Sequence, residues 1–181
     1  MRAYPGLAAV NAHVSLETGR LRMRLPRESD LDAFAAIYAD AASMQYLGDG
    51  KTLTRPETWR AITAMLGHWL VRGYGMFAVE RKDTGAMIGR VGFLNPEGWP
   101  GFELGWTLAH EQRGNGFATE AARAALAYAF DTLDQARVIS LIRPANAPSI
   151  RVAERLGQTL RSQSDLLGGP VLTYAIDRPA R

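Results

Sequence analysis

The chain has 181 residues, of which 47% are apolar and 22% are charged, the composition of an ordinary globular domain. It contains no cysteine, which excludes disulfides, thiolate metal sites and a cysteine nucleophile. The formal net charge of +3 suits an anionic partner but does not decide between a nucleotide cofactor and a nucleic acid. The histidines (His13, His68 and His110) show no ligand spacing, so no metal is expected.

Apolar segments along the chain are short. None approaches the roughly 20 residues that would span a bilayer. The N-terminus also lacks the apolar core of a signal peptide. We therefore expect a cytoplasmic protein with no membrane partner.

The first residues of the chain differ in character from the rest. Residues 1–15 mix Pro, Gly, Ala and Asn without periodicity, which predicts a loosely ordered arm. No repeat, low-complexity tract or interdomain linker follows. We therefore expect residues 16–181 to form a single domain.

A strand and two helices are predicted next. Apolar residues alternate with arginine over Leu21–Leu25, which is the period of a strand with one polar face. One amphipathic helix is expected to begin at Ser29 or Asp30, and a second one after Pro56. Met44–Thr54 between them is polar and rich in glycine, so we expect a loop there that carries function.

The pattern changes to short strands in the second half. Turn signals separate Met76–Glu80, Met87–Leu94 and Phe102–Leu108, and this spacing predicts an antiparallel meander. The elements expected after it are helix Ala118–Leu133, strand Val138–Ile142, helix Ser149–Leu156 and strands Gln158–Gln163 and Val171–Ile176. A strand, crossover helix and strand of this length form a parallel unit. The sequence therefore predicts an α+β fold with a mixed sheet and helices on its faces.

A glycine-rich turn, Arg113–Ala118, leads from the last meander strand into the following helix. Amide groups at the start of a helix lack intrahelical partners, and glycine lets a phosphate approach the backbone closely. The turn therefore predicts an anion site. A lone G-x-G is also compatible with nothing more than a tight turn. A dinucleotide fold would place the loop after the first strand of a βαβ unit, and a meander precedes it here.

Three residues of the turn match R-x-x-G-x-A, namely Arg113, Gly116 and Ala118, and Asn146–Gly157 follows at a characteristic distance. With these segments, residues 16 to 177 resemble the GNAT superfamily of acyl-CoA N-acetyltransferases, in particular its RimJ/RimL ribosomal-protein branch. The resemblance implies a three-layer αβα fold. Its central sheet is mixed, mostly antiparallel and splayed, with about six to seven strands and about four helices.

Acetyl-CoA is the cofactor that the resemblance implies, acting as co-substrate. Its pantetheine arm would lie between the splayed strands Phe102–Leu108 and Val138–Ile142. The cofactor-binding residues implied are Trp106, Thr107, Leu108, Arg113, Gly114, Asn115, Gly116, Phe117, Ala118, Thr119, Asn146 and Ser149.

Acetyl transfer to an amine needs a proton acceptor, because a lysine-like amine with a pKa of about 10.4 is protonated at pH 7. The resemblance makes Glu103 the candidate, although a solvated strand carboxylate is an equal alternative. A backbone N–H near Thr107 or Leu108 would stabilise the oxyanion.

Help for the leaving thiolate is expected from the last helix. Many superfamily members carry a tyrosine where this chain has Ala153. The RimJ/RimL branch instead carries a serine, matched here by Ser149, beside an asparagine matched by Asn146. Without a catalytic role, these two would be a helix-start residue and a turn residue.

The acceptor is expected to contact the variable early region, represented by Tyr46 and Asp49, together with Glu103. The sequence leaves open whether it is a protein N-terminus or a small-molecule amine. A non-catalytic acetyl-CoA sensor or scaffold is the alternative function. The spread of basic residues gives no support to nucleic-acid binding, and we expect a monomer or a homodimer.

Overall fold

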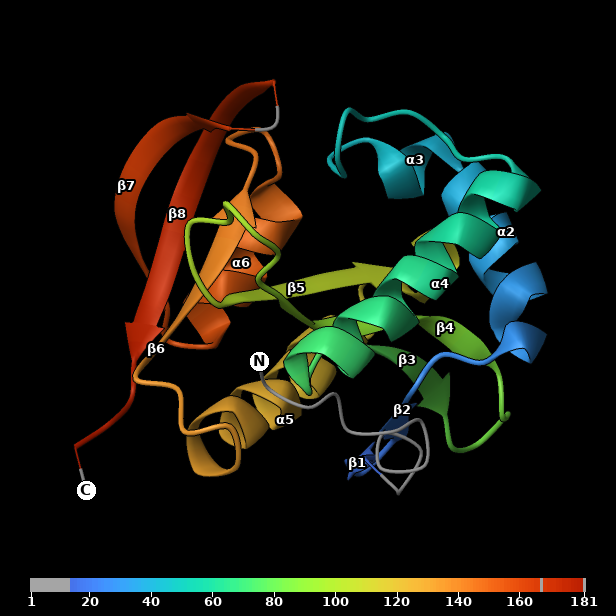
Figure 1. Ribbon diagram of the computed structural model, residues 1–181, viewed down its shortest axis with the longest axis horizontal. Helices are drawn as coiled ribbons and strands as arrows, with labels where there is room; N and C mark the ends of the chain where they lie inside the picture. Colours follow the sequence, from blue (N-terminus) through green and yellow to red (C-terminus); the bar gives the residue numbers. More distant parts are fainter. Residues whose placement is uncertain (1–13, 167, 181) are drawn as a thin grey trace.

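The computed structural model describes residues 14–166 and 168–180, so most of the predicted arm lies outside the described residues. The strands are β1 (Leu16–Glu17), β2 (Leu21–Arg24), β3 (Met76–Arg81), β4 (Met87–Leu94), β5 (Glu103–Leu108), β6 (Arg137–Ile142), β7 (Thr159–Leu166) and β8 (Gly169–Asp177). The helices are α2 (Leu31–Ala39), α3 (Ala41–Met44), α4 (Arg55–Arg72), α5 (Phe117–Asp131) and α6 (Ala147–Arg155), with short 3-10 turns η1 (Glu28–Asp30) and η2 (His110–Gln112). Figure 1 shows their arrangement.

One mixed sheet joins all the strands in the order β1-β2-β3-β4-β5-β6-β8-β7. Every neighbouring pair is antiparallel except β5 and β6, which are parallel. The predicted α+β class and mostly antiparallel sheet are confirmed. The described residues form eight strands and five helices, in line with the about six to seven strands and about four helices expected. The additional elements are β1 with two residues and α3 with four, which are too short to show a periodicity.

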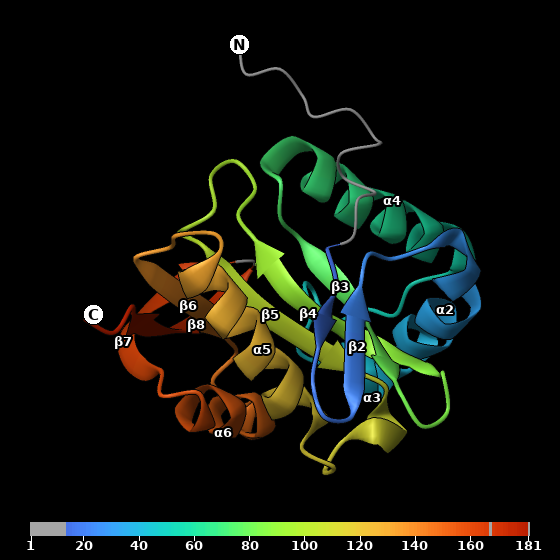
Figure 2. The same cartoon turned by 90° about the horizontal axis from the view of Figure 1, so that it is seen from below.

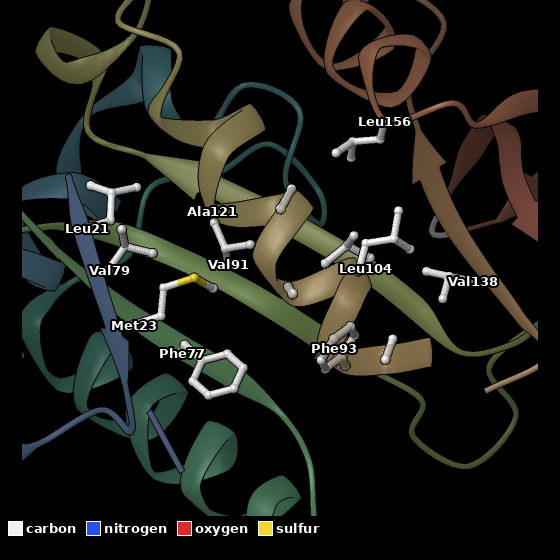
Figure 3. Close-up of a cluster of buried hydrophobic side chains, with 14 of the residues drawn as sticks. Leu21, Met23, Phe77, Val79, Val91, Phe93, Leu104, Ala121, Val138 and Leu156 are labelled. Carbon is white, nitrogen blue, oxygen red and sulfur yellow. The ribbon is translucent and has the colours of Figure 1, made fainter. Parts of the chain in front are cut away.

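Helices cover both faces of the sheet, as Figures 1 and 2 show. The face with α2, α3 and α4 is closed by an apolar cluster that includes Phe34, Tyr38, Ile62 and Met76. On the other face α5 lies across β4 and β5, and the labelled residues of Figure 3 pack there. Ala121 of α5 and Val91 and Leu104 of the sheet belong to the cluster on this face, and all three side chains are fully buried. The small residues on that side of α5 let the helix approach the strands closely.

Helix ends follow the capping chemistry of the sequence. Thr54 and Glu57 form a capping box at the start of α4, and Gly73 ends that helix in the left-handed conformation. α6 begins at Ala147 and not at the predicted Ser149, because the Asn146 side chain accepts the Ser149 amide and caps the helix. α5 likewise begins at Phe117, directly after Gly116.

Candidate active site

Strands β5 and β6 separate soon after they meet. Their ladder has one register pair, Glu103 with Ile139. The next carbonyl along β5, that of Leu104, accepts a 2.7 Å hydrogen bond from the Ser140 hydroxyl and not from a β6 amide. Alternation along the strand then leaves the Trp106 and Leu108 amides facing the gap. Main-chain donors of β5 are therefore available to a ligand between the strands.

A cavity of about 380 Å³ runs from this gap to the start of α5. Most of the predicted cofactor-binding residues line it: Trp106, Thr107, Leu108, Arg113, Gly114, Gly116, Phe117, Ala118, Thr119, Asn146 and Ser149. Asn115 instead holds the turn in shape, because its side-chain amide donates to the carbonyls of Gln112 at 3.2 Å and Arg113 at 3.3 Å.

The glycine turn owes its shape to two left-handed residues, Gly114 with φ of 80° and Gly116 with φ of 78°. The first hydrogen bond of α5 runs from the Glu120 amide to the Gly116 carbonyl at 3.0 Å. The amides of the preceding residues have no partner within the helix, and those residues line the cavity. This end of the cavity therefore offers a positive helix terminus to an anion.

Two arginines flank the glycine turn with different partners. Arg113 lines the cavity and its guanidinium donates to the Ala42 carbonyl at 3.1 Å, which ties the turn to α3. Arg20 forms a 2.6 Å ion pair with Glu120 and donates to the Asn115 carbonyl. Glu120 also accepts from the Thr18 hydroxyl. Glu120 therefore fastens the β1–β2 turn to α5.

At the mouth of the gap, Trp106 and Ser149 are in contact. The indole Nε1 of Trp106 donates to Ser149 Oγ at 3.2 Å, while Asn146 Oδ1 accepts the Ser149 amide at 3.2 Å. Asn146 thus caps α6, whereas its alternative interpretation expected only a turn residue. Because Ser149 Oγ receives a hydrogen bond, its own proton remains free to donate into the cavity.

Glu103 lies in a second cavity of about 300 Å³. Its side chain is buried, with 8% of the residue exposed. Trp99 Nε1 donates to Oε2 at 2.7 Å, and the Leu141 amide is a further donor. Burial raises the pKa of Glu103 to about 6, although both donors and the charge of Arg90 oppose that rise. Glu103 is therefore not the solvated carboxylate of the alternative reading.

The two cavities share part of their lining. Tyr46, Leu47, Trp106, Thr107, Asn146 and Ser149 belong to both. Glu103 therefore lies on one side of a junction whose other side leads to the glycine turn. Of the residues predicted for the acceptor, Tyr46 lies at this junction.

Asp49, also predicted for the acceptor, does not line either cavity. Its side chain is 65% exposed and forms a 2.8 Å ion pair with Lys51. The neighbouring Gly48 does line the second cavity, and its carbonyl accepts from the Arg143 guanidinium at 3.2 Å. This bond joins the α3–α4 loop to the β6–β8 half of the molecule at the top of Figure 1.

Sequence reasoning missed Trp99 and Arg90, which both line the second cavity. Trp99 lies in the turn between β4 and β5, where an aromatic side chain among Pro and Gly was the available signal. Arg90 is the one charged residue within the otherwise apolar strand β4, which was a stronger signal.

Among the described residues, no group of three His, Cys, Asp or Glu side chains could hold a metal ion. No helix of that part of the chain is long and apolar enough to cross a membrane.

Comparisons with known proteins agree with this geometry. The sequence matches the family described as Acetyltransferase (GNAT) domain over residues 20–159. YkkB, an uncharacterised protein of Bacillus subtilis, is 31% identical over 173 residues, which cover 91% of this chain and 96% of YkkB. The uncharacterised N-acetyltransferase YnaD of the same organism is 29% identical over 136 residues, 74% of this chain and 77% of YnaD.

Solved structures show the same fold. An acetyltransferase from Agrobacterium tumefaciens superposes with a TM-score of 0.83 at 30% identity, covering 98% of this chain and 99% of that one. RimL, a ribosomal alpha-N-protein acetyltransferase in complex with coenzyme A, superposes with a TM-score of 0.76 at 21% identity, covering 90% and 97%. The predicted resemblance is thereby confirmed, and the chain belongs to the GNAT family of N-acetyltransferases, whose fold binds acetyl-CoA.

Proposed function

We propose that the protein transfers the acetyl group of acetyl-CoA to a primary amine by direct attack in a ternary complex. The observation that carries this proposal is the junction of the two cavities at Thr107 and Ser149. It gives a thioester and an amine separate approaches to one point. The absence of cysteine also leaves no thiol to carry an acetyl group between two half-reactions.

The first cavity fits the shape and charge of acetyl-CoA. The amides of Phe117, Ala118 and Thr119 and the guanidinium of Arg113 would hold the pyrophosphate. The pantetheine arm would bind the Trp106 and Leu108 main chain between the splayed strands. Because the Thr107 main chain faces β4, the Leu108 amide is the better of the two predicted oxyanion donors.

Transfer would begin when the neutral amine nitrogen attacks the thioester carbonyl carbon. Glu103, with a pKa of about 6, is too weak a base to deprotonate a free ammonium of pKa about 10.4 to any extent. The nitrogen becomes far more acidic once its bond to carbon forms, and Glu103 would then accept its proton, directly or through a water. Collapse of the intermediate would break the C–S bond. The Ser149 hydroxyl would donate a hydrogen bond to the departing thiolate. The thiolate then takes up a proton from solvent, and Glu103 releases the proton of the amine to solvent.

A thiol-release assay over a panel of small amines and peptides tests the proposal. We expect thiol release that depends on both acetyl-CoA and an acceptor, and that falls by about 100-fold in Glu103→Gln, the usual size of a lost general base. Calorimetry measures the binding of acetyl-CoA in the first cavity separately from acetyl transfer. Tight binding without acceptor-dependent thiol release would instead favour a non-catalytic sensor or scaffold.

A further inference from the structure

Arg90 projects from the middle of β4 into the cavity that holds Glu103. In the β4–β5 ladder Arg90 is paired with Thr107, which is four residues from Glu103 along the same strand. Side chains four apart on a strand lie on the same face, and their Cα atoms are roughly 13 Å apart. Gly105 lies between them without a side chain, and a Cβ there would come within 3.9 Å of Glu103 Oε1. The cavity therefore has a carboxylate at one end and a guanidinium toward the other.

Within the described part of the chain, the guanidinium of Arg90 is partly buried without a hydrogen-bond acceptor or a carboxylate partner. Its Nε is buried without a hydrogen-bond acceptor, and no carboxylate of the described residues lies within ion-pair distance of its guanidinium. The ring of Tyr38 lies beneath it, 5.9 Å from the guanidinium carbon. That contact holds the side chain in place but offers no acceptor for its N–H groups.

Another arginine of the same sheet shows how the fold satisfies such a group. Arg24 on β2 donates to both carboxylate oxygens of Asp30 at 2.8 Å and to Glu80 at 3.0 Å. Arg90 has no such carboxylate. A buried donor without an acceptor costs free energy, and arginine cannot shed its charge to avoid that cost. A ligand that supplies an acceptor would recover it.

The second arginine of the cavity, Arg143, is already engaged. Its guanidinium donates to the carbonyls of Leu166 at 3.3 Å, Pro170 at 3.4 Å and Gly48 at 3.2 Å. Within the cavity, Arg90 is therefore the cation that is placed to receive an anionic ligand group.

Resting on the proposed function, we propose that the acceptor is a small amine that also bears a carboxylate, as an amino acid does, and that Arg90 binds this carboxylate. The amine would face Glu103 and the thioester, while the carboxylate would pair with the guanidinium. The volume of about 300 Å³ is at the small end of ligand sites and favours a free amino acid over a peptide chain. The paired opposite charges favour an acceptor of the same bipolar kind.

The test compares each of several amino acids with its own α-amide as acceptor, in wild type and in Arg90→Gln. The α-amide lacks the negative charge of the carboxylate, and its amino group has a lower pKa than that of the amino acid. That second difference cancels when the acid-to-amide ratio of kcat/KM is compared between enzymes. We expect Arg90→Gln to lower the ratio by about 10- to 100-fold, mainly through KM of the acid, because a charge-assisted bidentate contact is lost. Arg90→Lys should restore part of it.

Arg143→Gln is the matched control, because it removes a positive charge from the same cavity. It should leave the acid-to-amide ratio unchanged whatever it does to absolute rates. An unchanged ratio in Arg90→Gln, with thermal unfolding like that of wild type, would overturn the proposal. So would a panel in which peptides or uncharged amines are better acceptors than every carboxylate-bearing amine.

Calorimetry separates this inference from the proposed function. Amino acid and amide are titrated into the enzyme saturated with CoA, where no transfer can occur. Tighter binding of the acid by wild type, lost in Arg90→Gln, supports the carboxylate site even without thiol release. Equal binding of acid and amide counts against it even if acetyl transfer is observed.

Discussion

The indole Nε1 of Trp99 donates a 2.7 Å hydrogen bond to Oε2 of Glu103. Trp99 comes from the turn between β4 and β5, and it lines the same cavity as the carboxylate. The bond favours the ionised form of Glu103 and so limits the rise in pKa that burial causes. The turn therefore orients the Glu103 carboxylate and keeps its pKa from rising further.

Trp99→Phe keeps most of the aromatic bulk and removes the donor. Because a hydrogen bond to a charged group contributes about 1.5 kcal/mol or more, we expect the pKa of Glu103 to rise by about one unit. In the pH profile, log(kcat/KM) should rise with a slope of one between the pKa of Glu103 and that of the acceptor amine, because only the amine loses a proton there. Below the pKa of Glu103 both groups must lose a proton, so the slope should be two, and the profile has a break at the pKa of Glu103. The variant should move that break upward from pH 6.

The control for this substitution is Trp59→Phe, since Trp59 lies exposed on α4 away from both cavities. Its profile should coincide with that of wild type. A break at an unchanged pH in Trp99→Phe would show that the indole does not tune Glu103.

Glu103→Gln should lower activity but increase the free energy of unfolding relative to wild type as pH rises. Burial raises the pKa of Glu103 from 4.5 to about 6, so the folded state binds the proton more tightly than the unfolded state. Stability of the wild type therefore falls as pH rises from 4.5 to 6, by about 2 kcal/mol in total. The variant has no such loss. Denaturant unfolding should show Glu103→Gln gaining about 2 kcal/mol relative to wild type between pH 4 and pH 8; a constant difference would contradict the raised pKa.

Arg113→Gln tests the pyrophosphate site. The substitution removes a cation that lines the first cavity, and we expect KM for acetyl-CoA to rise by about tenfold, the size of one charge-assisted contact. Acetyl-pantetheine lacks the pyrophosphate, so its KM should not change. Arg60→Gln on the exposed side of α4 should leave both values unaltered. Equal losses with the two thioesters would place Arg113 outside the pyrophosphate site.

Ser149→Ala and Asn146→Ala should have different consequences although the two residues share a hydrogen bond. Ser149 contributes its backbone amide to the cap, so alanine keeps the cap and removes the proposed donor to the thiolate. We expect kcat to fall by about tenfold or more with little change in stability. Asn146→Ala should lower the free energy of unfolding by about 1 kcal/mol, as for other lost caps. A Ser149→Ala enzyme with unchanged kcat would leave Ser149 a structural residue only.

Local patterns were enough to predict most of the elements around this site. The alternation of Leu21–Leu25, the meander and the glycine turn before α5 depend on near neighbours in sequence, and the structure has strands and a helix start at those places. The order of elements, with α6 after the parallel crossover, also followed, although the cap that Asn146 provides for α6 did not. Roles for Glu103 and Ser149 came from the family resemblance, because spacing alone cannot give a side chain its chemistry.

The partners of individual side chains could not be predicted in the same way. Trp99 reaches Glu103 only because the β4–β5 turn folds back over its own strand. Arg90 reaches the cavity because β4 is the neighbour of β5. Asp49 was placed with the acceptor because its loop is polar, yet its carboxylate pairs with Lys51 in solvent. In each case the element was predicted, but sequence spacing does not show which way the side chain turns or which partner it meets.

His68 fastens the turn that carries Trp99, and we expect this connection to make the turn sensitive to acid. Its Nδ1 lies 2.7 Å from the Tyr74 carbonyl, and its Nε2 lies 3.1 Å from the Asn95 amide. A carbonyl can only accept and an amide can only donate, so the proton belongs on Nδ1 and Nε2 is the acceptor. Burial lowers the pKa of His68, the Tyr74 carbonyl opposes that shift, and the charge of Arg72 adds to it.

Protonation of His68 would place two N–H donors face to face and release the Asn95 end of the turn. A histidine whose folded pKa is below 6.5 contributes stability that is complete above pH 6.5 and is lost as pH falls through the folded value. Glu103 acts in the opposite sense between pH 4.5 and 6, so the comparison is best made in a Glu103→Gln background. There we expect the free energy of unfolding to fall on acidification from pH 7 to pH 5. His68→Leu should remove part of that fall, and the protection factor of the Asn95 amide, which corrects for the intrinsic pH dependence of exchange, should fall on acidification in the parent but not in the variant. Identical pH dependence in both would show that His68 does not hold the turn through its neutral ring.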